Sequence, residues 1–324
     1  RLHNYLTTQR ELSRMPQQSR VPLGWDRRSF IRTVGVLGAF SGGGVLFGRG
    51  REQARVQQIE GLTKIPLPPL AVGDELVVPK INFHPTDPYI TPNASFYRID
   101  TALSFPRVDR EKWKLRIHGL VEREKFFSMD DLLALPQVER IITLCCVSNQ
   151  VGGPLIGNAV WRGVLLKDVL ESCGIKKNAQ QVFSTSLDGW TSGFPITAAM
   201  DGRDALIAIG MNGESLPIMH GYPARLVVPG LYGYVSATKW LSEINITTWA
   251  EEEGYWIPRG WSRDAPVKTQ SRIDVPRQGE SIATGKFRLA GVAWAQHTGI
   301  EKVEIRIDRG TWQTCDLGVD LTDD

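Results

Sequence analysis

The chain has 324 residues, of which 42% are hydrophobic and 23% are charged, values typical of globular protein that exclude a disordered or collagen-like chain. Four cysteines in this length exclude a disulfide-stapled scaffold. No apolar run reaches 18 residues, so the sequence contains no unambiguous membrane span. At about 150 residues per domain, the length predicts two domains.

The net charge of +3 is unevenly distributed along the chain. Residues 1–64 carry 11 basic and 4 acidic side chains, a net +7, whereas residues 65–324 carry 27 basic and 31 acidic side chains, a net −4. A nucleic-acid interface normally concentrates basic charge on a folded face, so we expect no nucleic-acid partner. The sequence also begins without Met, and we expect it to be a fragment at both ends.

The basic N-terminal arm, residues 1–64, contains an uncharged segment at 33–48 with six glycines. Sixteen residues are short for a membrane-spanning helix, and a short apolar segment behind a charged region is typical of an export signal. Residues 27–32, Arg-Arg-Ser-Phe-Ile-Arg, resemble the twin-arginine export motif. We therefore expect export of the folded protein. Because no Ala-x-Ala site follows Gly48, we expect the segment to remain as an anchor on the outer face of the cytoplasmic membrane.

Four prolines predict an extended linker over residues 65–80. The next region, 81–262, mixes apolar runs with amphipathic and alternating segments. In chain order these predict a strand over 112–118, a helix over 128–135, a buried strand over 140–147, a helix over 163–173, and strands over 205–210 and 224–228. Because no series of long βαβ units is present, the fold class is predicted to be α+β.

Several common sites are absent from the sequence. It has no G-x-x-x-x-G-K-[ST] loop, no G-x-G-x-x-G that follows a strand, no C-x-x-C, no H-E-x-x-H and no G-x-S-x-G. A P-loop, a nicotinamide fold, a zinc site built from local spacing and a serine nucleophile elbow are therefore not expected.

Residues 143–149, Thr-Leu-Cys-Cys-Val-Ser-Asn, place two cysteines where a buried strand meets a polar turn. Buried cysteines are usually inert, and Cys145 and Cys146 as neighbours would form only a strained disulfide. A thiol at a strand end beside a glycine-rich loop is also a position for a ligand to a soft metal. The residues alone leave these interpretations open.

Residues 220–240 place basic and hydroxyl side chains on backbone interrupted by glycine. Basic side chains and exposed backbone N–H groups in loops suit a ligand that carries phosphate. The alternative is a loop with solvated charges.

Together these two segments resemble the sulfite oxidase family of molybdenum-cofactor enzymes, and the resemblance covers about residues 80–324. The family's Thr-Leu-x-Cys-x-x-Asn segment is matched by residues 143–149, which implies that Cys146 is the one protein ligand to molybdenum. The family's pyranopterin-phosphate segment is matched by residues 220–240. The resemblance therefore implies a molybdenum–molybdopterin cofactor and a sulfite-oxidase-type binding domain.

The resemblance also implies the roles of individual residues. The implied catalytic residues are Cys146, Arg98 and Tyr255, the last as a proton donor or oxygen orienter. The implied cofactor-binding residues are Phe96, Tyr97, Arg98, Asp100, Asn149, Asp188, His220, Arg225, Ser236, Thr238 and Lys239.

The sequence departs from the sulfite-oxidising members of the family. They have two arginines after the ligand segment, where this chain has Gln150 and Val151, and they have a histidine where this chain has Asp100. Because small dianions are usually held by arginine, the substrate stays open among sulfite-like anions, sulfoxides and N-oxides. We expect electrons to pass to a separate partner, either a cytochrome or a membrane redox protein.

The last region, 263–324, predicts strands over 287–294 and 300–307. Short strands joined by turns favour an immunoglobulin-like β-sandwich, which about 60 residues leave incomplete. The family resemblance implies that this domain forms a homodimer contact.

The predicted function is therefore an exported molybdopterin-dependent oxidoreductase that transfers an oxygen atom or two electrons. Two alternatives remain: a non-catalytic binding module that has kept the fold, and a thiol redox protein that uses Cys145 and Cys146.

Overall fold

The computed structural model describes residues 64–74, 76, 78, 88–102 and 104–318. The predicted export motif at residues 27–32 lies outside the described residues, as do parts of the predicted linker. Within the described ranges, no helix has the length and apolar character needed to cross a membrane.

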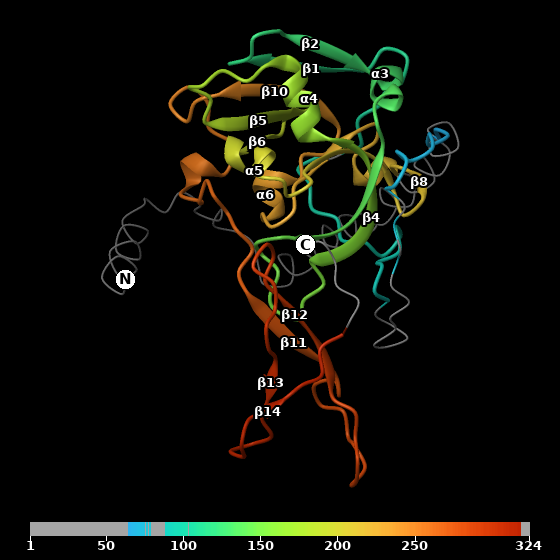
Figure 1. Cartoon of the computed structure of the whole chain (residues 1–324), viewed down its shortest axis with the longest axis vertical. Coiled ribbons are helices and arrows are strands. Elements are labelled where there is room, and N and C mark those ends of the chain that lie inside the picture. The colour runs from blue at the N-terminus through green and yellow to red at the C-terminus, as the bar shows by residue number, and fades with distance from the viewer. Residues whose placement is uncertain (1–63, 75, 77, 79–87, 103, 319–324) are drawn as a thin grey trace, which may run out of the picture. The chain divides into compact units, whose positions relative to one another are not determined.

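The first of two large sheets has the strand order β2-β1-β10-β5-β6 (Figure 1). Its strands are β1 (Lys114–Gly119), β2 (Lys125–Ser128), β5 (Gln181–Ser186), β6 (Thr191–Pro195) and β10 (Leu241–Thr247). β1 and β10 are parallel, and the other neighbouring pairs are antiparallel. Leu115 and Ile117 of β1 are fully buried while their neighbours are not, because successive side chains of a strand point to opposite faces.

The second sheet has the strand order β3-β4-β7-β8, with β9 also paired to β7. Its strands are β3 (Val138–Cys145), β4 (Ile156–Leu165), β7 (Leu206–Met211), β8 (Glu214–Ser215) and β9 (Arg225–Val227). β7 is buried along its whole length. Its alternate residues enter two different hydrophobic cores, Ile207 and Ile209 in one and Leu206 and Ala208 in the other. Burial on both faces explains why its sequence is continuously apolar.

Short helices connect these strands. They are the α-helices α3 (Met129–Ala134), α4 (Leu166–Cys173), α5 (Ile196–Met200) and α6 (Gly233–Ser236), and the 3₁₀ helices η1 (Ile218–His220) and η2 (Ile257–Arg259). Ser128 and Asp131 form a capping box at the start of α3, and Gly174 caps α4 with a φ of 73°. Both helix ends were expected from these residue types.

The smaller core lies against the second sheet and contains Phe96, Ile142, Leu144 and Trp161. It holds the segment before β1 against the C-terminal half of β3. Phe96 meets Trp161 edge-on, with 5.6 Å between ring centroids. This packing brings the predicted pterin-binding segment to the end of the cysteine-bearing strand.

The predicted α+β class is confirmed, with corrections at the ends of elements. The helix expected over 163–173 begins at Leu166, because residues 163–165 continue β4. The strand expected over 140–147 begins at Val138 and ends at Cys145. Hydrogen bonding between neighbouring strands sets the start of this helix and the ends of this strand, and the local sequence does not reveal that pairing.

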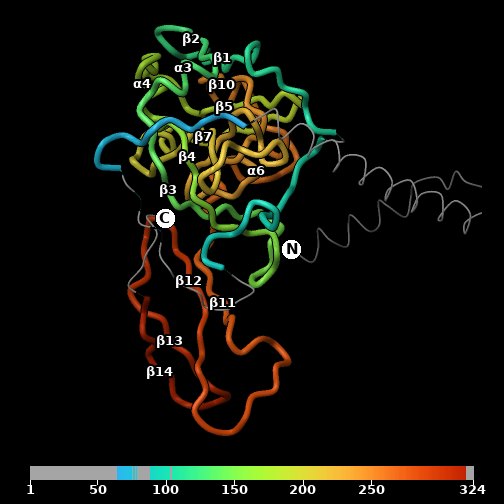
Figure 2. Tube along the Cα trace, turned by 90° about the vertical axis from the view of Figure 1, so that its right-hand side faces the viewer, coloured from blue at the N-terminus to red at the C-terminus, as the bar shows by residue number. Residues whose placement is uncertain are grey.

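The C-terminal residues form two separate two-stranded ladders, seen along the Cα trace in Figure 2. The strands are β11 (Gln270–Val275) with β12 (Ala290–Trp294), and β13 (Glu304–Ile305) with β14 (Gln313–Thr314). No hydrophobic side chain within residues 266–318 is buried, and Ile307 is 65% exposed. Since a sandwich needs a core between its sheets, the immunoglobulin-like domain stays a prediction.

Candidate functional site

Cys146 begins the loop that joins β3 to β4. Its backbone N–H donates to the Leu155 carbonyl over 2.9 Å, and the Asn149 N–H donates to the Cys146 carbonyl over 2.9 Å. The Asn149 side-chain oxygen accepts from the Leu155 N–H over 2.8 Å. Asn149 therefore fixes the position of Cys146 by closing the loop across its base.

The two cysteines differ in burial, and both are free thiols. Cys145 is buried at 2% exposure and points its thiol toward the Cys146 carbonyl at 3.5 Å, whereas Cys146 is half-buried. Burial, together with the neighbouring Cys146, raises the pKa of Cys145 to about 11. Because the thiolate is the metal-binding form, Cys146 is the better placed of the two to act as a ligand.

Phe96 and Tyr97 form an aromatic wall beside this loop, with stacked rings 5.3 Å apart. Burial raises the pKa of Tyr97 far above its usual value, against the lowering effect of Arg225, and both cysteines add to the rise. The Tyr97 hydroxyl is therefore neutral and able to donate a hydrogen bond. A Cβ on Gly233 would lie 3.4 Å from this hydroxyl, so the small residue leaves room for it.

Arg225 is the most deeply buried cation near this wall. Its guanidinium donates to the carbonyls of His220 at 3.0 Å, Ala237 at 3.3 Å and Leu226 at 3.4 Å, and lies 4.9 Å from the Trp161 ring centroid. Burial lowers the pKa of Arg225 to about 10. No carboxylate among the described residues pairs with it, which leaves a buried positive charge without a counter-charge.

Lys239 and Arg98 share a single carboxylate, that of Asp100. Asp100 Oδ2 accepts from Lys239 Nζ over 2.7 Å and from Arg98 Nε over 2.7 Å. Burial lowers the pKa of Lys239 to about 8, although Asp100 acts to raise it. Burial also acts to raise the pKa of Asp100, but Arg98 and Lys239 outweigh it and the net shift is downward.

His220 and Gly221 form the turn that brings Arg225 and Lys239 together. His220 Nε2 donates to the Asn93 carbonyl over 2.8 Å, and burial lowers the pKa of the ring to about 4, so the histidine is neutral. Gly221 has a φ of +115°, and a Cβ there would lie 3.1 Å from the Cβ of Arg225 and the Cα of Lys239. A glycine is therefore required at this turn.

The hydroxyls of Ser236 and Thr238 are buried and already have partners within the protein. Ser236 Oγ donates to the carbonyls of Leu231 and Tyr232, each at 3.1 Å. Thr238 Oγ1 lies 2.8 Å from Ser184 Oγ and 2.7 Å from Ser192 Oγ.

Ser184 and Ser192 are residues that sequence reasoning missed. They lie on β5 and β6 at fully buried positions, where apolar side chains are usual. A polar residue at a buried strand position was the signal that could have found them, but only once the strands were known.

Asp188 and Tyr255 make contacts outside the group formed by Cys146, Tyr97 and Arg225. Asp188 accepts from Thr101 Oγ1 at 3.3 Å and from the Trp190 N–H at 3.1 Å. Tyr255 is 40% exposed, and its ring contacts Trp190, Trp256 and Arg259. The structure thus brings Asp188 near the Asp100 segment but gives Tyr255 no contact with Cys146, Tyr97 or Arg225.

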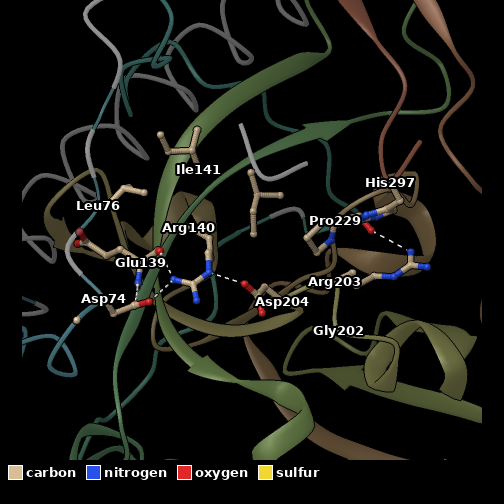
Figure 3. Close-up of a pocket in the computed structure, with 12 residues that line it drawn as sticks. Asp74, Leu76, Glu139, Arg140, Ile141, Gly202, Arg203, Asp204, Pro229 and His297 are labelled. Atoms are coloured by element: carbon tan, nitrogen blue, oxygen red, sulfur yellow. Dashed lines mark hydrogen bonds and ion pairs between the residues drawn. The ribbon is translucent and has the colours of Figure 1, made fainter. Parts of the chain in front are cut away.

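A cavity of about 500 Å³ lies elsewhere on the second sheet (Figure 3). Its lining includes Arg140, Asp74 and Asp204, and no predicted site residue belongs to it. Arg140 donates to Asp74 over 2.7 Å and to Asp204 over 2.5 Å. Because its central cation is paired with two carboxylates, this cavity is not the anion site.

The site residues fit a molybdopterin cofactor. Arg98 and Lys239 share the Asp100 carboxylate, and Arg225 has no carboxylate partner among the described residues. Burying this excess of positive charge is costly unless an anion enters. A phosphate would supply that anion. The described residues contain no group of three or more His, Cys, Asp or Glu able to hold a metal. A single half-buried thiol therefore suits a metal whose other ligands come from an organic cofactor.

The comparisons with known proteins agree with this geometry. Residues 102–256 match the family model described as the oxidoreductase molybdopterin binding domain. The chain is 30% identical to human mitochondrial sulfite oxidase over 275 residues, which cover 72% of this chain and 50% of that protein. It is 30% identical to Arabidopsis thaliana sulfite oxidase over 271 residues, 68% of each chain.

A similar solved structure is that of the sulfane dehydrogenase SoxCD from Paracoccus pantotrophus. It has a TM-score of 0.57 and 27% identity, and the match covers 68% of this chain and 63% of that one. The chain belongs to the sulfite oxidase family of molybdopterin oxidoreductases, whose cofactor is molybdenum–molybdopterin. It spans about half the length of the human relative.

Proposed function

We propose that this chain is an exported oxidoreductase that transfers an oxygen atom or two electrons to or from a small substrate. The observation that carries the proposal is the pair of buried cations, Arg225 and Lys239, close to the segment that bears the half-buried Cys146. When bound, the cofactor supplies a metal that exchanges an oxygen atom and two electrons with the substrate. The protein binds and orients it.

The proposed roles follow from charge and burial. Cys146 holds the metal as a thiolate, and Arg225 and Lys239 hold the phosphate. Tyr97 and His220 are both neutral at pH 7, so they face the pterin as hydrogen-bonding groups and add no charge.

Asn149, Ser236 and Thr238 contribute by holding the two loops that carry these groups. The role of Tyr255 as a proton donor stays a prediction.

The loop after Cys146 bears on the substrate. Ser148 and Gln150 give it no positive charge, and small dianions are usually bound by arginine forks. Among sulfite-like anions, sulfoxides and N-oxides, this loop favours the neutral oxides.

Electrons are proposed to pass to or from a separate redox protein, and residues 263–324 are proposed to form a homodimer contact. Export is proposed to use Arg27 and Arg28. Changing both to Lys keeps the charge but removes the guanidinium pair. We expect the folded, cofactor-loaded variant to stay in the cytoplasm when cells are fractionated, and normal export of that variant would overturn this part.

The test of the proposed function is elemental analysis of the purified chain combined with a substrate screen. We expect about one molybdenum per chain and turnover of at least one of sulfite, a sulfoxide or an N-oxide with a redox dye. A chain with no metal would support the binding-module alternative. Metal-independent activity that Cys145→Ser abolishes would support the thiol redox alternative.

A further inference from the structure

Five aromatic side chains, Trp190, Tyr234, Tyr255, Trp256 and Trp261, form a continuous series of ring contacts, here called the aromatic patch. Successive ring centroids lie 5.0 Å apart for Trp190 and Tyr255, 5.2 Å for Tyr255 and Trp256, 4.9 Å for Trp256 and Trp261, and 5.0 Å for Trp261 and Tyr234. None of the five rings is fully buried. The patch therefore presents a row of adjacent, partly exposed aromatic rings to the surface.

One end of the patch is attached to the Asp100 side of the cofactor site. Trp190 follows Asp188 closely and donates its N–H to that carboxylate over 3.1 Å, and Asp188 in turn accepts from Thr101. Thr101 is the residue after Asp100, the partner of Lys239.

The other end of the patch reaches the Tyr97 side of the site. Tyr234 follows Gly233, whose Cβ position lies 3.4 Å from the Tyr97 hydroxyl. Between the two ends, the Tyr255 N–H donates to the Thr191 carbonyl over 3.1 Å at the start of β6. One end of the patch thus lies two residues from Asp188, and the other lies next to Gly233, which faces Tyr97.

The composition of the patch is that of a protein-binding surface. Trp, Tyr and Arg are the residues that dominate binding energy at interfaces. The Arg259 guanidinium lies over the Tyr255 ring, 3.8 Å from its centroid, and the Tyr234 hydroxyl donates a hydrogen bond to the Ser262 carbonyl over 2.7 Å. These contacts fix the side chains before any partner arrives, which lowers the entropy lost on binding.

The charge around the patch is negative. Residues 249–264 contain four acidic and two basic side chains, a net −2, which is half of the net −4 carried by residues 65–324. One of the arginines, Arg263, is already paired with Glu253 at 2.9 Å. Glu251 and Asp264 are exposed, and Asp264 lies close enough to Tyr234 to add to the rise that burial causes in the pKa of that side chain. A partner with basic side chains around its own contact surface would complement this rim.

We propose that the aromatic patch is the docking surface for a small one-electron redox protein with a basic rim around the exposed edge of its cofactor. This inference rests on the proposed function, which needs an external electron acceptor or donor. Reduction of a neutral oxide takes up two electrons and two protons and releases water, so it would oxidise two such partner molecules in succession, one electron each; oxidation of a substrate by water would reverse this flow. The attachment beside Gly233 and Tyr97 connects the patch to the part of the site that carries Cys145 and Cys146.

A membrane surface is the competing occupant, since tryptophan and tyrosine also gather at bilayer interfaces. The acidic rim disfavours it, because anionic lipids attract basic segments and repel acidic ones. Binding of this protein to lipid vesicles is therefore measured as well, as the outcome that would contradict docking of a redox protein.

The test is a direct titration of the full-length, metal-loaded protein with two oxidised c-type cytochromes, one basic and one acidic, at low and high salt. We expect the basic cytochrome to bind more tightly and to lose affinity as salt rises. Trp256→Ala and Trp261→Ala should each weaken its binding by about 10- to 30-fold. Trp312→Ala is the matched control, because Trp312 is 58% exposed on the C-terminal ladders and should leave binding unchanged.

One further variant and one further measurement separate the docking result from misfolding and from failure of the proposed function. Glu252→Lys should weaken binding of the basic cytochrome and make that binding less dependent on salt. Because it reverses one charge and removes no aromatic ring, its effect does not depend on loss of packing. Turnover with a small redox dye, which needs no docking, should stay within about twofold in Trp261→Ala. Loss of dye turnover in the parent protein would overturn the proposed function and leave the binding titration valid.

Unchanged cytochrome binding in both tryptophan variants and in Glu252→Lys would overturn the docking proposal. Binding of the protein to anionic vesicles that Trp256→Ala abolishes, without cytochrome binding, would overturn it in favour of a membrane surface.

Discussion

The two-sheet region, residues 88–265, and the C-terminal ladders, residues 266–318, are both built from short strands with alternating sequence. In the first region the alternation produces burial, and strands such as β10 place Ile244 and Ile246 at 0% exposure. In the second region the same pattern leaves Ile273 60% exposed and Ile307 65% exposed. Alternation therefore predicts a strand, whereas a core also needs a second surface to pack against.

The two regions also differ in how they treat charge. In the two-sheet region Arg225 and Lys239 are both buried, and of the two only Lys239 has a carboxylate partner, Asp100. In the ladders Lys302 pairs with Glu304 at 3.2 Å, and both side chains are exposed. Exposed ion pairs contribute little to stability. Buried cations without enough counter-charge are costly for the fold, so their presence indicates a ligand.

The largest expected effect concerns stability. Ile244→Ala removes a fully buried side chain and should lower the free energy of unfolding by about 2–5 kcal/mol. Ile307→Ala removes a mostly exposed one and should change it by less than about 0.5 kcal/mol. Urea unfolding of both variants measures the difference. Equal losses would show that the ladders have a core of their own.

The next effect concerns cofactor retention. Arg225→Ala removes a buried guanidinium, and a charged hydrogen bond of about 1.5–3 kcal/mol corresponds to a loss of affinity of roughly 10- to 150-fold. Lys239→Ala should follow with a smaller loss, because an ammonium is a point charge rather than a fork. Lys302→Ala is the control. In the Arg225→Ala and Lys239→Ala variants, the molybdenum content per chain should fall. The turnover rate per bound molybdenum should stay unchanged.

That experiment also has a contrary result. Full metal occupancy with a collapsed rate in Arg225→Ala would place this side chain beside the substrate, and the phosphate assignment for residues 220–240 would then be wrong.

A third effect, seen only at low pH, is a pH dependence from His220. Its pKa is about 4 in the folded protein against 6.5 for the ordinary side chain, so between these values the unfolded chain binds more protons. His220 therefore stabilises the fold fully above pH 6.5, and this contribution is lost as the pH falls toward 4. At pH 5 the loss is on the order of 2 kcal/mol. The measurement is the free energy of unfolding of the parent protein and of His220→Gln at pH 5 and pH 8. The difference between the two proteins at each pH isolates the contribution of His220. A difference that does not change with pH would contradict a buried, neutral histidine.

Much of the fold was predictable where local chemistry decides it. The cap at Ser128, the glycine at 174 and the apolar run of β7 each predict an element that the structure contains. β5, β6 and β10 were missed, because Ser184, Ser192 and Ser242 interrupt the apolar pattern and find their hydrogen-bond partners in other segments of the chain.

The candidate site was predictable for a different reason. The segments 143–149 and 220–240 could be matched to a family, so Cys146, Arg225 and Lys239 could be named without the fold. The contacts that give these residues their properties were not predictable. The Asn149 bond to Leu155 depends on how the loop closes, the Asp100 bond to Lys239 joins residues 139 positions apart, and the turn at Gly221 depends on a positive φ.

The most direct test of the account is X-ray absorption at the molybdenum edge, which counts the sulfur atoms bound to the metal. We predict that Cys146→Ser lowers the sulfur count by one and lowers turnover by at least about 100-fold, because a direct metal ligand is lost. Cys145→Ser should leave both the count and the rate close to those of the parent protein, since its thiol is buried and protonated. A sulfur count that falls in Cys145→Ser and holds in Cys146→Ser would contradict the assignment of the metal ligand.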